Sequence, residues 1–396
     1  MAIAWVQAGV ARLLGANMHK KGAMSKIRRA IGLMSGTSMD GIDVGLLQSD
    51  GHSRLRRVTG ASYGYDGPFR ALLRQAMRDA SGLSDRMARP GCLGEAEREL
   101  TKRHGDAVAR FLDEQAITAG EIDVIGFHGQ TVLHRPELGL TVQLGDGAAL
   151  AGASGIDVVY DFRAADCASG GEGAPLVPVY HQALAARLPQ RPLVFVNIGG
   201  IANITYVGLD GRLIAFDCGP GNALIDDWVA RHAGQDQDTD GAIAAAGAVD
   251  RGALMTLMRH SYFSQAAPKS LDRNAFSPAP VAALSLADGA ATLTAFTAKA
   301  IADGAAILPR EPELWVICGG GRHNRTMMRM IAERVGNAVV PAEAVHLDGD
   351  FMEAEAFAFL AVRALEGLPL TYPETTGVAQ PTCGGIFASA SHRLPG

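Results

Sequence analysis

A glycine-rich turn near the start of the chain carries the residue types needed to hold an anionic ligand. In IGLMSGTSMDGIDVGLL, residues 31–47, two apolar runs flank the turn of residues 36–43. Successive backbone N–H groups in such a turn form a concavity that holds phosphate, and glycine removes the side chain that would block the approach. Asp40 and Asp43 would repel phosphate, so they fit better as partners of a magnesium ion, of its water or of the turn itself. The alternative is a tight hairpin that needs glycine only for a positive φ.

A second candidate for chemistry is Asp217, which ends the apolar run LIAF and precedes the sequence CGPG. A carboxylate at a strand end that reaches a water molecule or a hydroxyl group can act as a general base. The alternative is an aspartate that satisfies the backbone of its own turn. The string GASYG, residues 60–64, matches a serine nucleophile elbow only by chance, because residues 65–68 separate Ser62 from any following helix.

Two further segments, residues 126–134 and 160–181, combine glycines with polar side chains. The polar residues of interest there are His128, Asp161, Arg163, Asp166 and Glu172. Clustered hydrogen-bonding groups suit a polyol or a sugar with a carboxylate, for which Arg163 would be the fork-shaped partner. The alternative for His128 and His134 is a satisfied core histidine. A metal site is disfavoured because the chain has no HExxH motif and no cysteine pair near these histidines.

Two well-known phosphate-binding motifs are absent from the sequence. No Gly-Lys dipeptide occurs in the chain, which excludes a Walker A loop. The segment CGGGRHN, residues 318–324, is not a dinucleotide motif either, because Asn324 stands where the third glycine is required. A turn on the adenosine side of a nucleotide remains open for this segment.

The elements that position these residues alternate between short β-branched runs and helical patterns, which is typical of an α/β protein. Helical spacing predicts helices over residues 69–77 and 357–365. The strand, glycine-rich turn and strand of residues 31–47 return in LVFVNIGGIANITYV, residues 193–207, which indicates two domains built alike. Ligands collect where such turns leave the carboxyl ends of strands, so we expect the turns to face one cleft.

Composition limits the class of protein. With 48% apolar and 19% charged residues among 396, the chain is long enough for two folded domains. A formal net charge of -5 gives no general attraction to nucleic acid or to anionic lipid. Five dispersed cysteines indicate reduced thiols and a reducing, cytoplasmic compartment. Residues 1–27 fit neither a secretory signal nor a membrane helix, and we interpret them as an N-terminal extension or a mis-assigned start.

The motifs are most informative as an ordered set. In chain order they are GLMSGTSMDGID, GFHGQT, DFRAADCASGGEGAPLVP, NIGGIANIT, FDCGPGNALID, PKSLDRNAF, CGGGRHN and MEAEAFAFLA. This set resembles the anhydro-N-acetylmuramic acid kinases, of the superfamily of sugar kinases and actin-like ATPases. The resemblance implies an α/β fold of two similar actin-like, ribonuclease H-like domains around a nucleotide cleft. Domain 1 would span residues 28–165 and 355–396, and domain 2 residues 166–354.

The resemblance also implies an activity. Such an enzyme uses ATP with Mg²⁺, and water, to open the 1,6-anhydro ring of a cell-wall sugar and to phosphorylate the freed 6-oxygen. The product would be N-acetylmuramic acid 6-phosphate, formed in the cytoplasm during peptidoglycan recycling. The implied partners are small molecules, with a homodimer and without nucleic acid or membrane.

The family's functional positions fall on specific residues of this chain. The implied catalytic base is Asp217, which would deprotonate the water that attacks the anomeric carbon. The implied ATP-binding residues are Gly36, Thr37, Ser38, Met39, Asp40, Gly41, Ile42, Asp43, Gly199, Gly200, Gly319, Gly320, Gly321 and Asn324. The implied sugar contacts are His128, Gln130, Asp161, Arg163 and Glu353. The magnesium ligands are not implied. The sequence departs from the family pattern in its N-terminal stretch and in the acidic segment DQDTD, residues 236–240.

Two other functions remain open at this stage. A kinase of the same superfamily could phosphorylate an ordinary hydroxyl of a free amino sugar, or an acetate-like acid, and would also need an aspartate base. A nucleotide-driven scaffold or chaperone of the actin type would need peptide-binding or filament surfaces. Only opening of an anhydro ring requires water as a substrate, which separates the first alternative by experiment.

Overall fold

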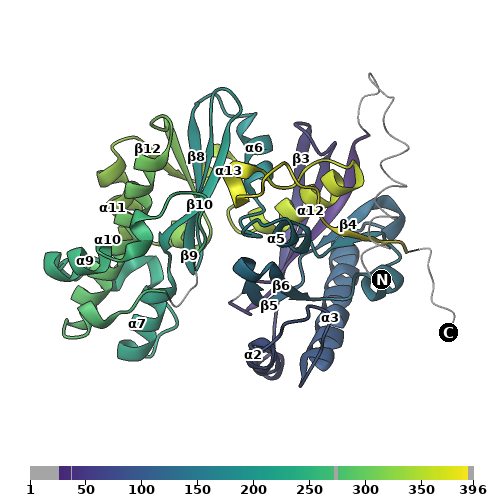
Figure 1. The fold of residues 1–396 in the computed structure, drawn as a ribbon, viewed down its shortest axis with the longest axis horizontal. Coiled ribbons are helices and arrows are strands. Elements are labelled where there is room, and N and C mark those ends of the chain that lie inside the picture. Colours follow the sequence, from purple (N-terminus) through teal and green to yellow (C-terminus); the bar gives the residue numbers. More distant parts are fainter. Residues whose placement is uncertain (1–25, 37, 272–274, 391–396) are drawn as a thin grey trace.

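The computed structural model describes residues 26–36, 38–271 and 275–390, arranged as two α/β lobes side by side (Figure 1). Thr37 and most of the extension expected at residues 1–27 lie outside the described residues. Among the helices that are described, none combines the length and the apolar character needed to span a bilayer.

The first lobe is built on a six-stranded sheet in the spatial order β13-β7-β4-β1-β2-β3. The strands are β1 (Arg28–Met34), β2 (Gly41–Ser49), β3 (Leu55–Gly64), β4 (Val124–Phe127), β7 (Val158–Tyr160) and β13 (Ile386–Ala388). A separate hairpin of β5 (Gln130–Arg135) and β6 (Leu140–Leu144) follows β4. The second lobe holds a five-stranded sheet in the order β10-β9-β8-β11-β12. Its strands are β8 (Leu193–Ile198), β9 (Ile201–Val207), β10 (Leu213–Pro220), β11 (Leu314–Cys318) and β12 (Ala338–Pro341).

The two sheets share one topology. In each, three consecutive strands form an antiparallel meander: β1, β2 and β3 in the first sheet, β8, β9 and β10 in the second. In each, the first strand of the meander then pairs in parallel with a fourth strand, which pairs in parallel with a fifth. This confirms the predicted fold of two similar actin-like α/β domains. The repeated hairpin of the sequence is the visible part of that duplication.

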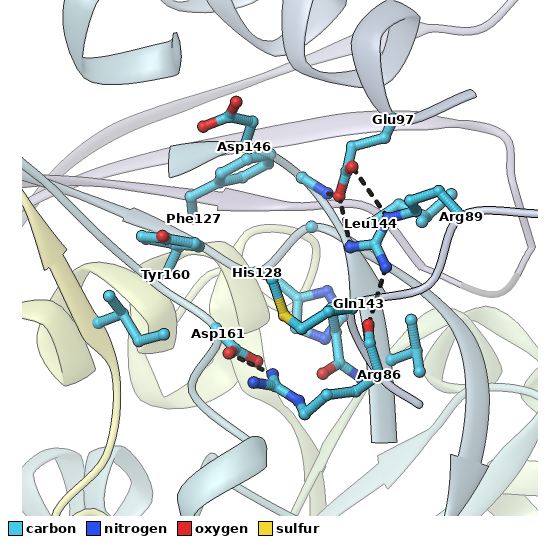
Figure 2. A pocket seen from close by; sticks show the side chains of 15 residues that line it. Arg86, Arg89, Glu97, Phe127, His128, Gln143, Leu144, Asp146, Tyr160 and Asp161 are labelled. Atoms are coloured by element: carbon cyan, nitrogen blue, oxygen red, sulfur yellow. Dashed lines mark hydrogen bonds and ion pairs between the residues drawn. The ribbon is translucent and has the colours of Figure 1, made fainter. Parts of the chain in front are cut away.

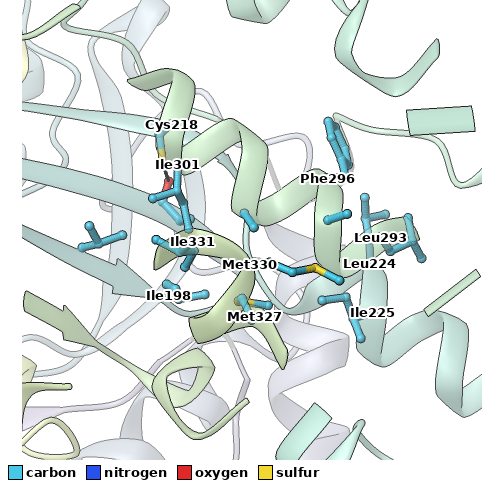
Figure 3. Packing of buried hydrophobic residues seen from close by; sticks show 14 of the residues in the cluster. Ile198, Cys218, Leu224, Ile225, Leu293, Phe296, Ile301, Met327, Met330 and Ile331 are labelled. Carbon is cyan, nitrogen blue, oxygen red and sulfur yellow. Dashed lines mark hydrogen bonds between the residues drawn. The ribbon is translucent and has the colours of Figure 1, made fainter. Parts of the chain in front are cut away.

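Helices cover the outer face of each sheet. In the first lobe these are α2 (Gly67–Ala80), α3 (Leu93–Glu114) and α4 (Gly147–Ser154). In the second they are α7 (Ala223–Ala233), α8 (Ala242–Ala245), α9 (Arg251–Met258), α10 (Leu286–Asp303) and α11 (Arg325–Val335). Figure 3 shows α10 and α11 packing their apolar side chains toward the sheet, with Ile301 close to Cys218 of β10. The helix predicted over residues 69–77 is confirmed as α2.

A third apolar layer joins the two lobes. It contains α6 (Pro178–Ala185) and α12 (Met352–Leu365), and its buried residues come from both sheets, including Ala30 of β1 and Phe195 of β8. The short helices α5 (Ala164–Ala168) and α13 (Pro373–Thr376) complete the helices of the described chain. The chain leaves the first sheet after β7 and returns to it with α12 and β13. The division into units at residues 165 and 355 stays a prediction.

The helix α12 lies unusually close to the first sheet because three strands present glycine to it. A Cβ atom added at Gly32 would overlap the Ala354 carbonyl, and one added at Gly126 would overlap the Phe357 carbonyl. At Gly45 the added Cβ would lie 2.8 Å from the Glu355 nitrogen. The helix predicted over residues 357–365 is therefore confirmed, and its position depends on strand glycines.

We expect Gly126→Ala to lower the free energy of unfolding by about 1–3 kcal/mol or more, because the new methyl group must displace backbone rather than a flexible side chain. Denaturant unfolding measures this change. Gly120→Ala is the control, since an added Cβ there meets nothing within 4 Å. Equal midpoints for the two variants would contradict the close contact between α12 and the sheet.

Candidate active site

Three glycine-rich turns of the second sheet meet at one edge. The strands β8, β10 and β11 run in the same direction, so the β8–β9 turn and the ends of β10 and β11 lie together. Asn222 donates its backbone N–H to the Gly199 carbonyl (2.7 Å) and its side-chain Nδ2 to the Ile198 carbonyl (3.2 Å). A Cβ at Gly321 would overlap the Ile198 side chain. The turns therefore pack on one another, as the sequence predicted for strands that end at one edge.

The glycines predicted to contact nucleotide fall into two groups. A Cβ added at Gly199, Gly200 or Gly320 would meet its nearest atom at 3.7–3.8 Å, so these positions leave room beside the backbone. Gly319, in contrast, has a φ of +72°, and a Cβ there would overlap the Asn197 side chain. The first group leaves space that a ligand can use, whereas Gly319 and Gly321 are already required by the packing of the turns.

Asn324 has a structural role in the described chain. Its side chain accepts the Met327 N–H at 2.9 Å and so forms the N-cap of α11. The residue is 8% exposed, and a Cβ at Gly241 would overlap its side-chain oxygen. The contact between Asn324 and nucleotide stays a prediction, and the cap explains the residue type without it.

The turn between β1 and β2 is closed by its own hydrogen bonds. Met39, at a φ of +55°, donates its N–H to the Gly36 carbonyl at 3.1 Å, and the Ser38 hydroxyl donates to Asp40 at 2.8 Å. Gln130 reaches the turn from β5 by donating Nε2 to the same Gly36 carbonyl at 3.1 Å. Its Oε1 atom is buried and has no hydrogen-bond partner among the described residues. Through this hydrogen bond, the turn predicted to bind phosphate contacts Gln130, which is predicted to bind the sugar.

The remaining residues of this turn differ in exposure. Ile42 is buried in the core, and Gly41 lies against β3, where an added Cβ would come 2.5 Å from a carbonyl oxygen. The Asp43 carboxylate accepts the Ser62 hydroxyl at 2.5 Å. Burial raises the pKa of Asp43 to about 6, although the Ser62 hydrogen bond acts against that rise. Ser62 thus lies within β3 and supports Asp43, which agrees with the interpretation that GASYG is no nucleophile elbow.

Asp217 lies near the end of β10, where a bulge interrupts the pairing with β9. Its carboxylate accepts the Leu271 N–H at 2.8 Å, and its own N–H donates to the Lys269 carbonyl at 3.0 Å. The Tyr262 hydroxyl donates to the Asp217 carbonyl at 2.6 Å. The side chain is surrounded by protein yet keeps partial solvent exposure. The carboxylate is therefore held in one place, on a residue that is half-buried.

The surroundings of Asp217 favour the protonated acid more than water does. Burial raises the pKa of Asp217 to about 7, and the negative charge of Glu172 adds to the rise. The Leu271 hydrogen bond and the positive charge of Arg163 oppose it. A carboxylate whose pKa lies close to neutral pH is suited to accept a proton in catalysis.

Arg163 and His128 form one polar contact at the ends of β4 and β7. The guanidinium approaches His128 Nε2 through Nε (3.2 Å) and Nη2 (3.1 Å), and its Nη1 donates to the Gly173 carbonyl at 2.8 Å. Burial and the Arg163 charge hold the pKa of His128 well below its usual value, so the ring is neutral and Nε2 can accept. The His128 ring also packs on Phe357 of α12, with ring centroids 4.6 Å apart.

Glu353 begins α12 and faces the same region. Asn197 of β8 donates to its carboxylate at 3.4 Å, which connects the helix to the second sheet. Burial raises the pKa of Glu353, Arg163 lowers it and Asp43 raises it further. Arg163 acts electrostatically on both Glu353 and Asp217, and Asp43 acts on Glu353, so pairwise charge interactions connect these four predicted residues. They come from four distant parts of the sequence.

Asp161 lies in an adjoining pocket with a volume of about 280 Å³ (Figure 2). Its carboxylate forms an ion pair with Arg86, and Arg89 pairs with Glu97 beside it. The residue has a φ of +57°, and its Oδ1 atom is buried without a partner among the described residues. His128 also lines this pocket. Asp161 therefore faces Arg86, and His128 connects the pocket to the cluster around Arg163.

Five residues surround Asp217, namely Glu172, Tyr262, Lys269, Ser270 and Leu271. The sequence analysis named Glu172 among the clustered polar groups that suit a sugar and gave the other four no role. Lys269 and Leu271 contact Asp217 through backbone atoms, Tyr262 contacts its backbone carbonyl, and Ser270 contacts Glu172. Hydrogen bonds to backbone atoms do not require a particular residue type, so the sequence does not reveal them. The motif PKSLDRNAF was the sequence feature that could have identified this loop, because it belongs to the ordered set of family motifs although no role was assigned to it. Residues 272–274 of that string lie outside the described residues.

No three His, Cys, Asp or Glu side chains gather into a metal-binding group within residues 26–36, 38–271 and 275–390. Magnesium does not require such a group, because it usually keeps several waters and binds one or two carboxylates together with substrate phosphates. The paired carboxylates Asp40 and Asp43, whose charges repel one another, offer that smaller set.

Comparisons with known proteins identify the family of this chain. Residues 28–389 match the sequence model of the family described as anhydro-N-acetylmuramic acid kinase. A protein of that name from Agrobacterium fabrum is 51% identical over 373 residues, covering 93% of this chain and 100% of the relative. One from Rhodopseudomonas palustris is 54% identical over 361 residues, covering 91% and 98%.

Among solved structures, a hexokinase from Schistosoma mansoni complexed with glucose aligns with a TM-score of 0.41 at 11% identity, covering 85% of this chain and 86% of that one. The sequence relatives span nearly the whole of both chains at more than half identity. This chain belongs to the anhydro-N-acetylmuramic acid kinase family.

Proposed function

We propose that the protein is a kinase that uses ATP and water to convert 1,6-anhydro-N-acetylmuramic acid into N-acetylmuramic acid 6-phosphate and ADP. Membership of the family supports this activity and its place in peptidoglycan recycling. The structural observation that carries the proposal is Asp217, a fixed and partly exposed carboxylate whose pKa is raised to about 7. Its carboxylate interacts electrostatically with Arg163, one of the residues predicted to hold the sugar.

The reaction divides between two bonds. Asp217 takes a proton from a water molecule, whose oxygen attacks the anomeric carbon while the bond from that carbon to the 6-oxygen breaks. The released 6-oxygen attacks the γ-phosphorus of ATP, and the bond to the β-phosphate oxygen breaks to give ADP. Ordinary glycosidases need a second carboxyl group to protonate the leaving oxygen. Here phosphoryl transfer replaces that acid, so one carboxylate is sufficient and the anomeric centre is inverted.

The polar groups around Asp217 have roles in binding. Arg163 remains a cation even in its buried place, since an arginine is not deprotonated in proteins, and it presents fixed donors to an acidic or hydroxylated sugar. Neutral His128 accepts from Arg163 and fixes the orientation of the guanidinium. Glu353, at the start of α12, adds an acceptor for sugar hydroxyl groups.

Backbone groups of the β1–β2 turn and of Gly199, Gly200 and Gly320 would receive the nucleotide phosphates. A magnesium ion bound by Asp40 or Asp43 would neutralise phosphate charge, which is its usual contribution to phosphoryl transfer. Burial is the main cause of the raised pKa of Asp43, and the negative charges of Asp40 and Asp350, which add to that rise, would favour such a cation. The homodimer and the cytoplasmic location belong to this proposal through the family resemblance.

Asp217→Asn should abolish turnover, because the amide keeps the shape of the side chain and cannot accept a proton. ADP release is measured with 1,6-anhydro-N-acetylmuramic acid and with N-acetylmuramic acid, with magnesium present. We expect turnover only with the anhydro sugar and a loss of at least about 100-fold in the variant. Glu374→Gln, which alters an exposed ion pair with Arg212, is the matched control. Equal turnover of both sugars, or an active Asp217→Asn, would refute the mechanism.

The pH dependence follows from the raised pKa of Asp217. A general base works when deprotonated, so kcat/KM should rise with pH, level off above about 7 and fall about tenfold per pH unit below that value. The profile is obtained from initial rates at low sugar concentration, measured at roughly ten pH values between about 5 and 9. A profile without a fall below neutral pH would show that Asp217 is not the titrating base.

Isotopic labelling separates the proposal from a kinase that phosphorylates an ordinary hydroxyl. In ¹⁸O-labelled water, the label should enter the anomeric hydroxyl of the product and not its phosphate, because water attacks carbon and the sugar oxygen attacks phosphorus. Mass spectrometry before and after exchange of the anomeric oxygen measures the position. Absence of label from the anomeric hydroxyl at early times would favour the alternative, because phosphorylation of an existing hydroxyl takes no oxygen from water.

A further inference from the structure

The loop of residues 269–271 surrounds the backbone and the carboxylate of Asp217. Lys269 accepts the Asp217 N–H through its carbonyl at 3.0 Å, and the Leu271 N–H donates to the carboxylate at 2.8 Å. Lys269 Nζ in turn donates to the Tyr262 carbonyl at 3.1 Å, while the Tyr262 hydroxyl donates to the Asp217 carbonyl at 2.6 Å. The position of this loop therefore decides where the carboxylate points.

The middle residue of that loop is anchored elsewhere. Ser270 donates its hydroxyl to Glu172 Oε2 at 2.5 Å, across 98 residues of sequence. Glu172 belongs to the segment between α5 and α6, which enters the second lobe from the first. The hydrogen bond between Ser270 and Glu172 is the direct side-chain connection between that crossover segment and the loop that holds the base.

Hydrogen bonds fix the backbone on both sides of Glu172. Its N–H donates to the Thr376 carbonyl at 2.7 Å, and the Gly173 N–H donates to Asp166 at 2.6 Å. The Thr376 hydroxyl donates to the other oxygen of Asp166 at 2.7 Å. An added Cβ at Gly171 would overlap the Asp166 carboxylate, so that glycine flanking Glu172 is required by the packing. The carboxylate of Glu172 thus projects from a fixed turn.

The negative charge of Glu172 also acts on Asp217. The ionisable groups that face Asp217 from the elements packed around it are Glu172, Arg163, Cys218, Tyr262 and Lys269. Glu172 is a carboxylate, and its charge adds to the rise that burial causes in the pKa of Asp217, while Arg163 opposes that rise. Arg163 contacts the residue that follows Glu172, because it donates to the carbonyl of Gly173.

We propose that Glu172 is a positioning residue for Asp217, acting through the Ser270 hydroxyl on loop 269–271 and through its negative charge on the base. The inference rests on the proposed function, in which Asp217 accepts the proton of water. Glu172 does not contact the reacting atoms in this proposal. Its two effects, one mechanical and one electrostatic, can be removed separately.

The test compares pH profiles of kcat/KM for the anhydro sugar in two variants. Glu172→Gln keeps an oxygen that can accept from Ser270 and removes the charge, so the fall in rate below neutral pH should move to lower pH by about half a unit or more. Ser270→Ala keeps the charge and releases the loop, which weakens the Leu271 hydrogen bond. That fall should stay in place or move to higher pH, and kcat should drop roughly tenfold to 100-fold with little change in the KM for sugar.

Two controls separate positioning from general damage. Ser270→Thr retains the hydroxyl and should restore most of the kcat lost in Ser270→Ala. Glu374→Gln removes a negative charge from the neighbouring helix α13, where the carboxylate pairs with Arg212, and should leave the pH profile unchanged. Thermal unfolding of every variant verifies that each compared enzyme is folded.

The inference is overturned if the profile of Glu172→Gln coincides with that of the wild type and Ser270→Ala retains full kcat. An inactive Asp217→Asn beside those two results would leave the proposed function intact and reject this inference alone. An active Asp217→Asn would reject both.

Discussion

The close packing of α12 on the first sheet is the contact on which the rest of the structure depends. Gly32, Gly45 and Gly126 remove the side chains that would hold the helix away, so its backbone lies directly against β1, β2 and β4. The opposite face of the helix joins the apolar layer shared with the second sheet. The same contact fixes the start of α12, where Glu353 faces the cleft. One helix thus sets the distance between the lobes and the position of a predicted sugar contact.

A buried polar connection reinforces this layer. Glu355 of α12 accepts Arg57 from β3 at 2.8 Å and the Tyr180 hydroxyl from α6 at 2.7 Å. Its side chain is only 3% exposed, so the carboxylate depends on these donors for compensation. Because α6 follows the crossover that carries Glu172, the helix that joins the lobes and the loop that holds Asp217 belong to one connected framework.

The sequence predicted the elements of the site better than their contacts. The hairpins at residues 31–47 and 193–207 and the helices at 69–77 and 357–365 are local patterns of period two or 3.6, and all are confirmed. Asn324 and Asp161 show what such patterns cannot decide. The first caps α11 and the second pairs with Arg86, 75 residues away, because each side chain bonds whatever neighbour folding brings to it. Their assigned roles toward ligands stay predictions.

The sequence by itself determined the family, the duplicated α/β fold and the identity of Asp217 as the candidate base, because ordered motifs and strand-end glycines are read directly from residue order. Only the tertiary structure decided how that base is held. The raised pKa of Asp217 arises from burial and from Glu172, 45 residues earlier, and the restraint on its carboxylate comes from a backbone N–H of Leu271. Desolvation and backbone hydrogen bonds depend on where distant segments meet, and no residue pattern along the chain records that meeting.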